Sequence, residues 1–98
     1  MYELTVTSYF SGAHRLRYLH GKCEELHGHN WKVEVSVASS KLSQEGVVID
    51  FKVLKQKMEK VLKTLDHTYL NDLPYFSGIE PSSENIAKYI FDHLKKEL

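Results

Sequence analysis

The stretch "HGHNWKVEVSVA", residues 27–38, indicates the fold, because its part from Trp31 to Ala38 predicts a β-strand and residues 27–30 lead into it. From Trp31 to Val37 every second position is apolar, and valine predominates there, as expected of a strand with one buried face. Residues 2–12 show the same alternation. The two stretches are therefore expected to pair as antiparallel strands. About 17 residues connect them, more than a hairpin turn needs, and this favours a functional loop.

Two helices are predicted after the strands. Asp50 is a suitable N-cap for a helix of about four turns with one apolar face. That face comprises Phe51, Leu54, Met58, Val61, Leu62 and Leu65. A second helix is expected to begin within residues 81–84, where proline, two serines and a glutamate follow one another. Its apolar stripe comprises Ile86, Ile90, Phe91, Leu94 and Leu98.

The order strand, strand, helix, helix predicts an α+β architecture with both helices on one face of an antiparallel sheet. The 98 residues are enough for one small domain, and no linker divides them. A sheet of two strands is thin and leaves both edges unpaired. We therefore expect oligomerisation or additional strands.

Charge and composition exclude several classes of function. Thirteen basic residues balance thirteen acidic ones, so no overall field attracts nucleic acid or an anionic membrane. The chain has no apolar run near the ~18 residues that a membrane span needs, and its first residues lack the pattern of a signal peptide. The single cysteine, Cys23, is expected to be a free thiol. These features predict a cytoplasmic protein.

Three histidines are candidate metal ligands. His27 and His29 alternate in phase with Trp31, so both rings are expected on the apolar face of the strand and away from water. His14 has the matching parity at the end of the first strand, and antiparallel pairing brings it opposite the pair. Three imidazoles with an open fourth position are typical of catalytic zinc, although nickel, copper and iron also take imidazole ligands. Two histidines in a polar loop without a metal remain the alternative.

Cys23 and the pair Asp66 and His67 are candidates for acid–base chemistry. Cys23 lies four residues before His27, so it is suited either to close the metal site as a ligand or to act nearby as a thiolate base. Asp66 is able to fix the tautomer of His67 if the two side chains meet. The alternative is that His67 ends the first helix as a cationic cap.

Ser82, Ser83 and Glu84 are expected first to cap the second helix and only second to offer free backbone N–H groups to a ligand. Arg15, Arg17 and Lys22 lie near the histidines in sequence. Basic residues are common on surfaces, so none of the three is assigned to phosphate binding.

Five stretches together resemble the family of 6-pyruvoyl-tetrahydropterin synthases and 6-carboxy-tetrahydropterin synthases. They occur in the family's order over most of the chain: "FSGAHRL" at 10–16, "CEELHGHNW" at 23–31, "VVIDF" at 47–51, "LDHTYLND" at 65–72 and "PSSENIA" at 81–87. The resemblance implies a tunnelling-fold (T-fold) subunit. It also implies a homo-oligomer, a trimer or hexamer, with active sites at subunit interfaces.

By this resemblance, each candidate residue acquires a role. His14, His27 and His29 bind Zn²⁺, and Cys23 is the catalytic base, with Asp66 and His67 completing its proton-transfer triad. The Ser82 to Glu84 segment contacts the pterin ring.

The substrate implied is 7,8-dihydroneopterin triphosphate, without nucleic acid or membrane partners. Three residues separate Cys23 from His27, as in the 6-carboxy-tetrahydropterin synthases of queuosine and deazapurine biosynthesis. A zinc-dependent lyase that releases acetaldehyde and triphosphate is therefore expected. A pyruvoyl-forming synthase and a non-catalytic zinc- or pterin-binding module remain alternatives. The resemblance also implies two C-terminal strands, one with a substrate-binding glutamate, that are absent from residues 1–98.

Overall fold

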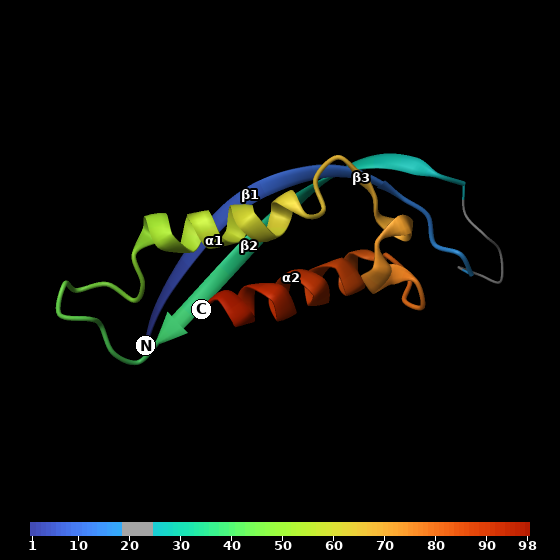
Figure 1. Ribbon diagram of the computed structural model, residues 1–98. Coiled ribbons are helices and arrows are strands. Elements are labelled where there is room, and N and C mark those ends of the chain that lie inside the picture. The colour runs from blue at the N-terminus through green and yellow to red at the C-terminus, as the bar shows by residue number, and fades with distance from the viewer. Residues whose placement is uncertain (19–24) are drawn as a thin grey trace.

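A computed structural model describes residues 1–18 and 25–98. Two long strands, β1 (Tyr2–His14) and β2 (His27–Ser39), form an antiparallel ribbon that arches over the helices α1 (Phe51–Lys63) and α2 (Ser83–Glu97), which lie on one face of it (Figure 1). A two-residue strand, β3 (Thr68–Tyr69), and the short 3-10 turns Leu70–Asp72 and Pro74–Phe76 connect the helices. The predicted α+β architecture is confirmed.

The strand pairing is more extensive than predicted. Pairing in β1 and β2 runs without a break from Tyr2 opposite Ser39 to His14 opposite His27, so each strand reaches the histidines. The predicted limits at residues 12 and 31 were therefore too short. The sheet also has a third strand, in the order β2-β1-β3, because β3 pairs in parallel with β1 at residues 12–13. Two residues are too few to show an alternating pattern.

The capping predictions are confirmed. Asp50 accepts a hydrogen bond from the backbone N–H of Lys52 at 2.8 Å, and the Ser82 hydroxyl accepts one from the N–H of Asn85 at 3.2 Å. Each side chain satisfies a donor that the first turn of a helix leaves free. Both helices therefore begin where the sequence indicates, at Phe51 and Ser83.

The core lies between the inner face of the sheet and the two helices. Its largest members with almost no exposed surface are Phe76, Leu54, Met58, Leu62, Leu65, Leu70 and Val6. Phe51, Phe91 and Leu98 were predicted on the buried faces of the helices, but they are 54%, 64% and 55% exposed, and Tyr89 is buried in α2 instead. Phe91 and Leu98 line an open groove between β2 and α2.

An open apolar groove of about 890 Å³ separates β2 from α2. Val33, Val35 and Val37 line one wall, and Ile90 and Phe91 belong to the other. Among the described residues the outer edge of β2 has no strand partner. The thin, open sheet expected from the sequence is therefore present.

Candidate metal and acid–base site

The three candidate histidines lie together at the open end of the ribbon. His14 is directly opposite His27, and His29 is opposite Gly12. The ring centroid of His14 lies 4.6 Å from that of His27 and 6.1 Å from that of His29. The centroids of the His27 and His29 rings are 6.4 Å apart. Trp31 packs beside the rings of His14 and His29 at 4.9 Å and 4.8 Å. The sequence-based prediction that these side chains converge on the Trp31 side of the strands agrees with this geometry.

The three rings differ in burial. His14 is 8% exposed, whereas His27 and His29 are exposed, so the prediction that the pair is shielded from water is wrong. Both lie at the end of the ribbon beyond Trp31, where neither helix covers the sheet. Alternation along a strand predicts on which face of the sheet a side chain lies. It does not predict whether a helix covers that face at this position.

In His14 and in His27, one ring nitrogen makes a hydrogen bond to a backbone carbonyl. Nδ1 of His14 lies 2.7 Å from the carbonyl oxygen of Pro81, and Nδ1 of His27 lies 3.2 Å from that of Glu25. Since a carbonyl only accepts, Nδ1 carries the proton in each neutral ring and Nε2 keeps its lone pair. Such contacts orient the histidines of metal sites.

The donor set fits zinc in chemistry and proximity. Zinc takes neutral imidazole nitrogens and tolerates three protein ligands with a fourth position open. Within residues 1–18 and 25–98, however, no three side chains of His, Cys, Asp or Glu stand ready to hold an ion as they lie. The exposed rings of His27 and His29 are able to turn toward His14 without repacking of the core. Metal binding thus requires side-chain rotation.

Asp66 and His67 form a second polar unit beside β1. Oδ2 of Asp66 lies 2.9 Å from Nδ1 of His67, and Oδ1 accepts from the backbone N–H of Ser11 at 2.9 Å. The backbone N–H of His67 donates to the carbonyl of Ser11 at 2.5 Å. The carboxylate is therefore fixed to the strand while it orients the imidazole, as a histidine acid–base pair requires.

His67 adopts an uncommon backbone conformation. Its φ is 56°, in the left-handed region that non-glycine residues rarely occupy, and its side chain is 81% exposed. The helix ends at Lys63 with Thr64 as its C-cap, so the alternative that His67 ends it as a cationic cap is wrong. Beneath this turn, a Cβ on Gly12 would lie only 3.1 Å from the carbonyl oxygen of Thr68, so the close approach favours glycine.

In Asp66→Asn, the free energy of unfolding is expected to fall less between neutral and acid pH than it does in wild type. The hydrogen bond from Ser11 is the largest cause that lowers the pKa of Asp66 below its usual value of 3.8, and the bond with His67 adds to it. The carboxylate therefore stabilises the fold above about pH 4, and this contribution disappears as pH falls through the lower, folded-state pKa. In urea unfolding, the difference in midpoint between wild type and variant should be larger at pH 7 than at pH 2.5. A difference that does not change with pH contradicts this account.

Asp92→Asn is the matched control. The pKa of Asp92 is also lowered, with the hydrogen bond from Lys88 as the largest cause, in an exposed pair on α2. Because its partner is a full charge in water, the effect of Asp92→Asn should diminish at high salt. The effect of Asp66→Asn should persist there, since a backbone N–H is its main partner.

The proposed substrate segment lies at the start of α2. The hydroxyl of Ser82 is used for the cap, whereas Ser83 and Glu84 are exposed and Ser83 lines the groove beside β2. Pro81, which directly precedes this segment, makes the backbone hydrogen bond to His14. This segment and the histidine cluster are therefore neighbours, as the sequence-based roles require. Cys23 lies outside the described residues.

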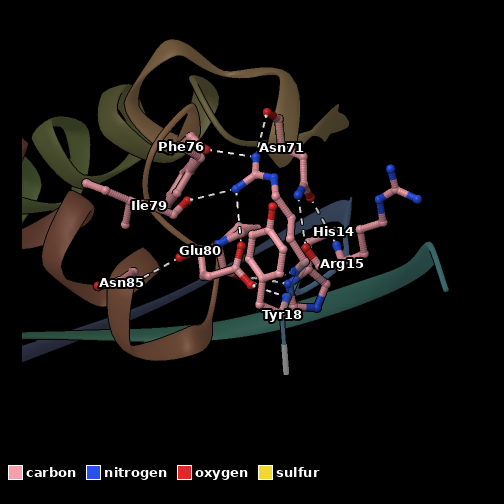
Figure 2. A network of polar contacts seen from close by, with 10 residues as sticks. His14, Arg15, Tyr18, Asn71, Phe76, Ile79, Glu80 and Asn85 are labelled. Atoms are coloured by element: carbon pink, nitrogen blue, oxygen red, sulfur yellow. Dashed lines mark hydrogen bonds and ion pairs between the residues drawn. The ribbon is translucent and has the colours of Figure 1, made fainter. Parts of the chain in front are cut away.

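A network that sequence analysis missed joins the end of β1 to the approach to α2 (Figure 2). Arg17 forms an ion pair with Glu80 at 3.2 Å and donates to the backbone carbonyl of Phe76 at 2.8 Å. Asn71 binds the backbone of Arg15 through both ends of its amide, at 3.0 Å and 2.9 Å. The Arg17 guanidinium is thus engaged within the chain. Partners more than 50 residues apart give no local sequence signal.

These features define a class: an α+β subunit in which a long β-hairpin covers two helices and ends in a cluster of histidines, with an aspartate–histidine pair beside it. A family model described as 6-pyruvoyl tetrahydropterin synthase matches residues 3–98. The chain belongs to this family, and it has the tunnelling fold.

Individual relatives agree with this assignment. The chain is 45% identical over 93 residues to a 6-carboxy-5,6,7,8-tetrahydropterin synthase of Synechocystis, covering 89% of this chain and 70% of the relative. It is 39% identical over 103 residues to the 6-pyruvoyl tetrahydrobiopterin synthase of Homo sapiens, covering 91% and 71%.

Solved structures give the same result. The 6-pyruvoyl tetrahydropterin synthase of Caenorhabditis elegans superposes with a TM-score of 0.78 at 33% identity, covering 97% of this chain and 77% of that one. The Plasmodium vivax enzyme gives 0.82 at 29% identity, with 98% and 78% covered. The described part of the chain also contains no helix long and apolar enough to cross a membrane.

Proposed function

We propose that this protein is a zinc-dependent 6-carboxy-5,6,7,8-tetrahydropterin synthase. Its substrates are 7,8-dihydroneopterin triphosphate and one water molecule, and the products are 6-carboxytetrahydropterin, acetaldehyde and triphosphate. The observation that carries the proposal is the convergence of His14, His27 and His29 within 6.4 Å, centroid to centroid, at one end of the ribbon. The 45% identity to a relative of that name supports the carboxy product.

His14, His27 and His29 are the residues that would hold the metal. Bound zinc would act as a Lewis acid toward the side-chain hydroxyls of the substrate. The contribution of the chain is to present neutral imidazoles: the carbonyl of Pro81 keeps the proton of His14 on Nδ1 and leaves Nε2 as the donor. Trp31 packs against the rings of His14 and His29 and so limits where these rings lie.

Asp66, His67 and Cys23 are proposed to move protons. Asp66 accepts from Nδ1 of His67, so that Nε2 of this exposed ring is able to exchange a proton with the substrate or with a thiol. Cys23 supplies the thiolate base, since a nearby cation lowers the pKa of a thiol.

The two halves of the site are proposed to come from different subunits. Among the described residues, His67 has no ring contact with His14, His27 or His29, whereas those three contact one another. A homo-oligomer, a trimer or hexamer, would bring the acid–base pair of one subunit to the metal of the next. The unpaired edge of β2 and the open groove beside it also favour association with further strands or subunits.

Ser83 and Glu84 are proposed to contact the pterin ring together with Ser82, through free backbone N–H groups at the start of α2. Residues 1–98 act as one domain in this scheme. The place of the reaction in queuosine and deazapurine biosynthesis, in the cytoplasm, is part of the same proposal.

The test is incubation of the zinc-loaded protein with 7,8-dihydroneopterin triphosphate and identification of the products. Release of acetaldehyde together with triphosphate is expected. Loss of triphosphate with the carbon side chain retained would instead identify a pyruvoyl-forming synthase, the second candidate, which the 39% identity to the human enzyme favours. Zinc binding without turnover would leave a non-catalytic zinc- or pterin-binding module and contradict the proposed activity.

A further inference from the structure

The side chain of Arg17 makes several of the contacts that join the segment after β1 to the approach to α2. The Arg17 guanidinium donates to the backbone carbonyls of Asn71 and Ile79, each at 3.3 Å, and to that of Phe76 at 2.8 Å. It also donates to Oε1 of Glu80 at 3.2 Å. Four acceptors from residues 71–80 thus converge on one planar side chain, which is the geometry that arginine, unlike lysine, is able to provide.

Glu80 makes hydrogen bonds both to the segment after β1 and to α2. Its second oxygen, Oε2, accepts from the backbone N–H groups of Arg17 at 2.5 Å and Tyr18 at 3.1 Å. Its own carbonyl accepts from the side-chain amide of Asn85 in α2 at 3.0 Å. Glu80 therefore links the end of β1 to the first turn of the helix.

The next residue holds the buried histidine. Pro81 is almost completely buried, and its carbonyl oxygen lies 2.7 Å from Nδ1 of His14. The proline ring restricts φ to near −65° and so removes one of the two backbone rotations between Glu80 and this carbonyl oxygen. The ion pair of Arg17 and Glu80 is thus one residue away from the contact that sets the tautomer of His14. Figure 2 shows His14, Glu80 and Asn71 within this network.

We propose that Arg17 and Glu80 are positioning residues for the metal site. Through Pro81, their ion pair holds His14 with Nδ1 protonated and Nε2 available to an ion. This proposal rests on the proposed zinc site. Outer contacts of metal-binding histidines typically change metal affinity by about 10- to 100-fold. Because Glu80 acts through Pro81, a weakening of about tenfold is expected, at the lower end of that range.

The experiment compares Glu80→Gln with wild type, each as the metal-free protein. Glutamine retains the shape but has only one acceptor oxygen, whereas Glu80 uses two. Zinc affinity, measured by competition with a chromophoric chelator, should fall about tenfold. Arg17→Lys should also lower zinc affinity, because lysine keeps the charge but cannot bind three carbonyls and a carboxylate. This second variant tests the proposal if Glu80→Gln does not fold.

Asp92→Asn is the control for removal of a carboxylate from an ion pair. It disrupts the exposed pair with Lys88 on α2, 2.8 Å in length, without contact with His14, and should leave zinc affinity unchanged. A second readout does not depend on metal: the nitrogen NMR shifts of the His14 ring at pH 8. Wild type should show the Nδ1–H tautomer, and Glu80→Gln a larger share of Nε2–H.

The outcomes separate this inference from the proposed function. If wild type binds zinc and Glu80→Gln binds it as tightly, with an unchanged tautomer, the positioning role is contradicted. If wild type does not bind zinc, the proposed function fails, and the NMR comparison alone decides whether Glu80 positions His14. An equal loss of affinity in Asp92→Asn would also contradict the inference, because it would show a general effect of charge.

Discussion

Replacing Cys23 with alanine is expected to lower turnover by about 10²- to 10⁴-fold, the usual contribution of a positioned general base. Zinc stoichiometry should stay the same, because three imidazoles suffice to hold the ion while the fourth position serves the substrate. The measurement pairs the rate of acetaldehyde release with the zinc content of the dialysed variant.

The opposite pattern would change the assignment of Cys23. If Cys23→Ala loses its zinc, the thiolate is a ligand and the metal site is closed, as in structural zinc sites. Cys23→Ser is a useful companion, since a hydroxyl preserves the size of the side chain but is a poor base near neutral pH. It should resemble alanine in rate and wild type in zinc content.

His29→Ala is expected to weaken zinc binding by more than about 100-fold, beyond the range observed for outer contacts of metal ligands. His29 is exposed, so removal of its ring should leave the core and the unfolding midpoint nearly unchanged. His14→Ala should lose zinc as well. Because His14 is buried against Trp31, however, that variant is also expected to lose stability.

His93→Ala is the matched control for the histidine variants. His93 lies on α2 and, like His14, has Nδ1 close to a backbone carbonyl, that of Tyr89 at 2.8 Å. Its ring stacks on Tyr89 at 3.9 Å and lies among aromatic side chains rather than in the histidine cluster. Its replacement should leave zinc affinity intact. Equal losses for His93→Ala and His29→Ala would show that the cluster is not the binding site.

Much of the fold follows from local patterns in the sequence. The alternation around Trp31 and the N-caps at Asp50 and Ser82 each depend on residues within a few positions, and all three predictions are confirmed. The convergence of the histidines needed only the parity of His14 and His27 and an antiparallel pairing. Such features are readable because strand and helix periods relate nearby residues directly.

The remaining features depend on contacts between distant segments. The left-handed conformation at His67 and the two-residue strand after it arise where the chain meets Ser11, more than 50 residues earlier. Arg17 and Glu80 are 63 positions apart and have the residue types of ordinary surface charges. Phe91 is exposed at the open groove between β2 and α2, and periodicity within one helix does not show which part of its apolar face another element covers.

The most direct test of the central claim is zinc-edge X-ray absorption of the zinc-loaded protein. The account predicts one zinc per chain with three nitrogen ligands at about 2.0–2.1 Å and an exchangeable oxygen ligand in the remaining position. A sulfur ligand at about 2.3 Å, or a zinc with fewer than three imidazoles, would contradict it.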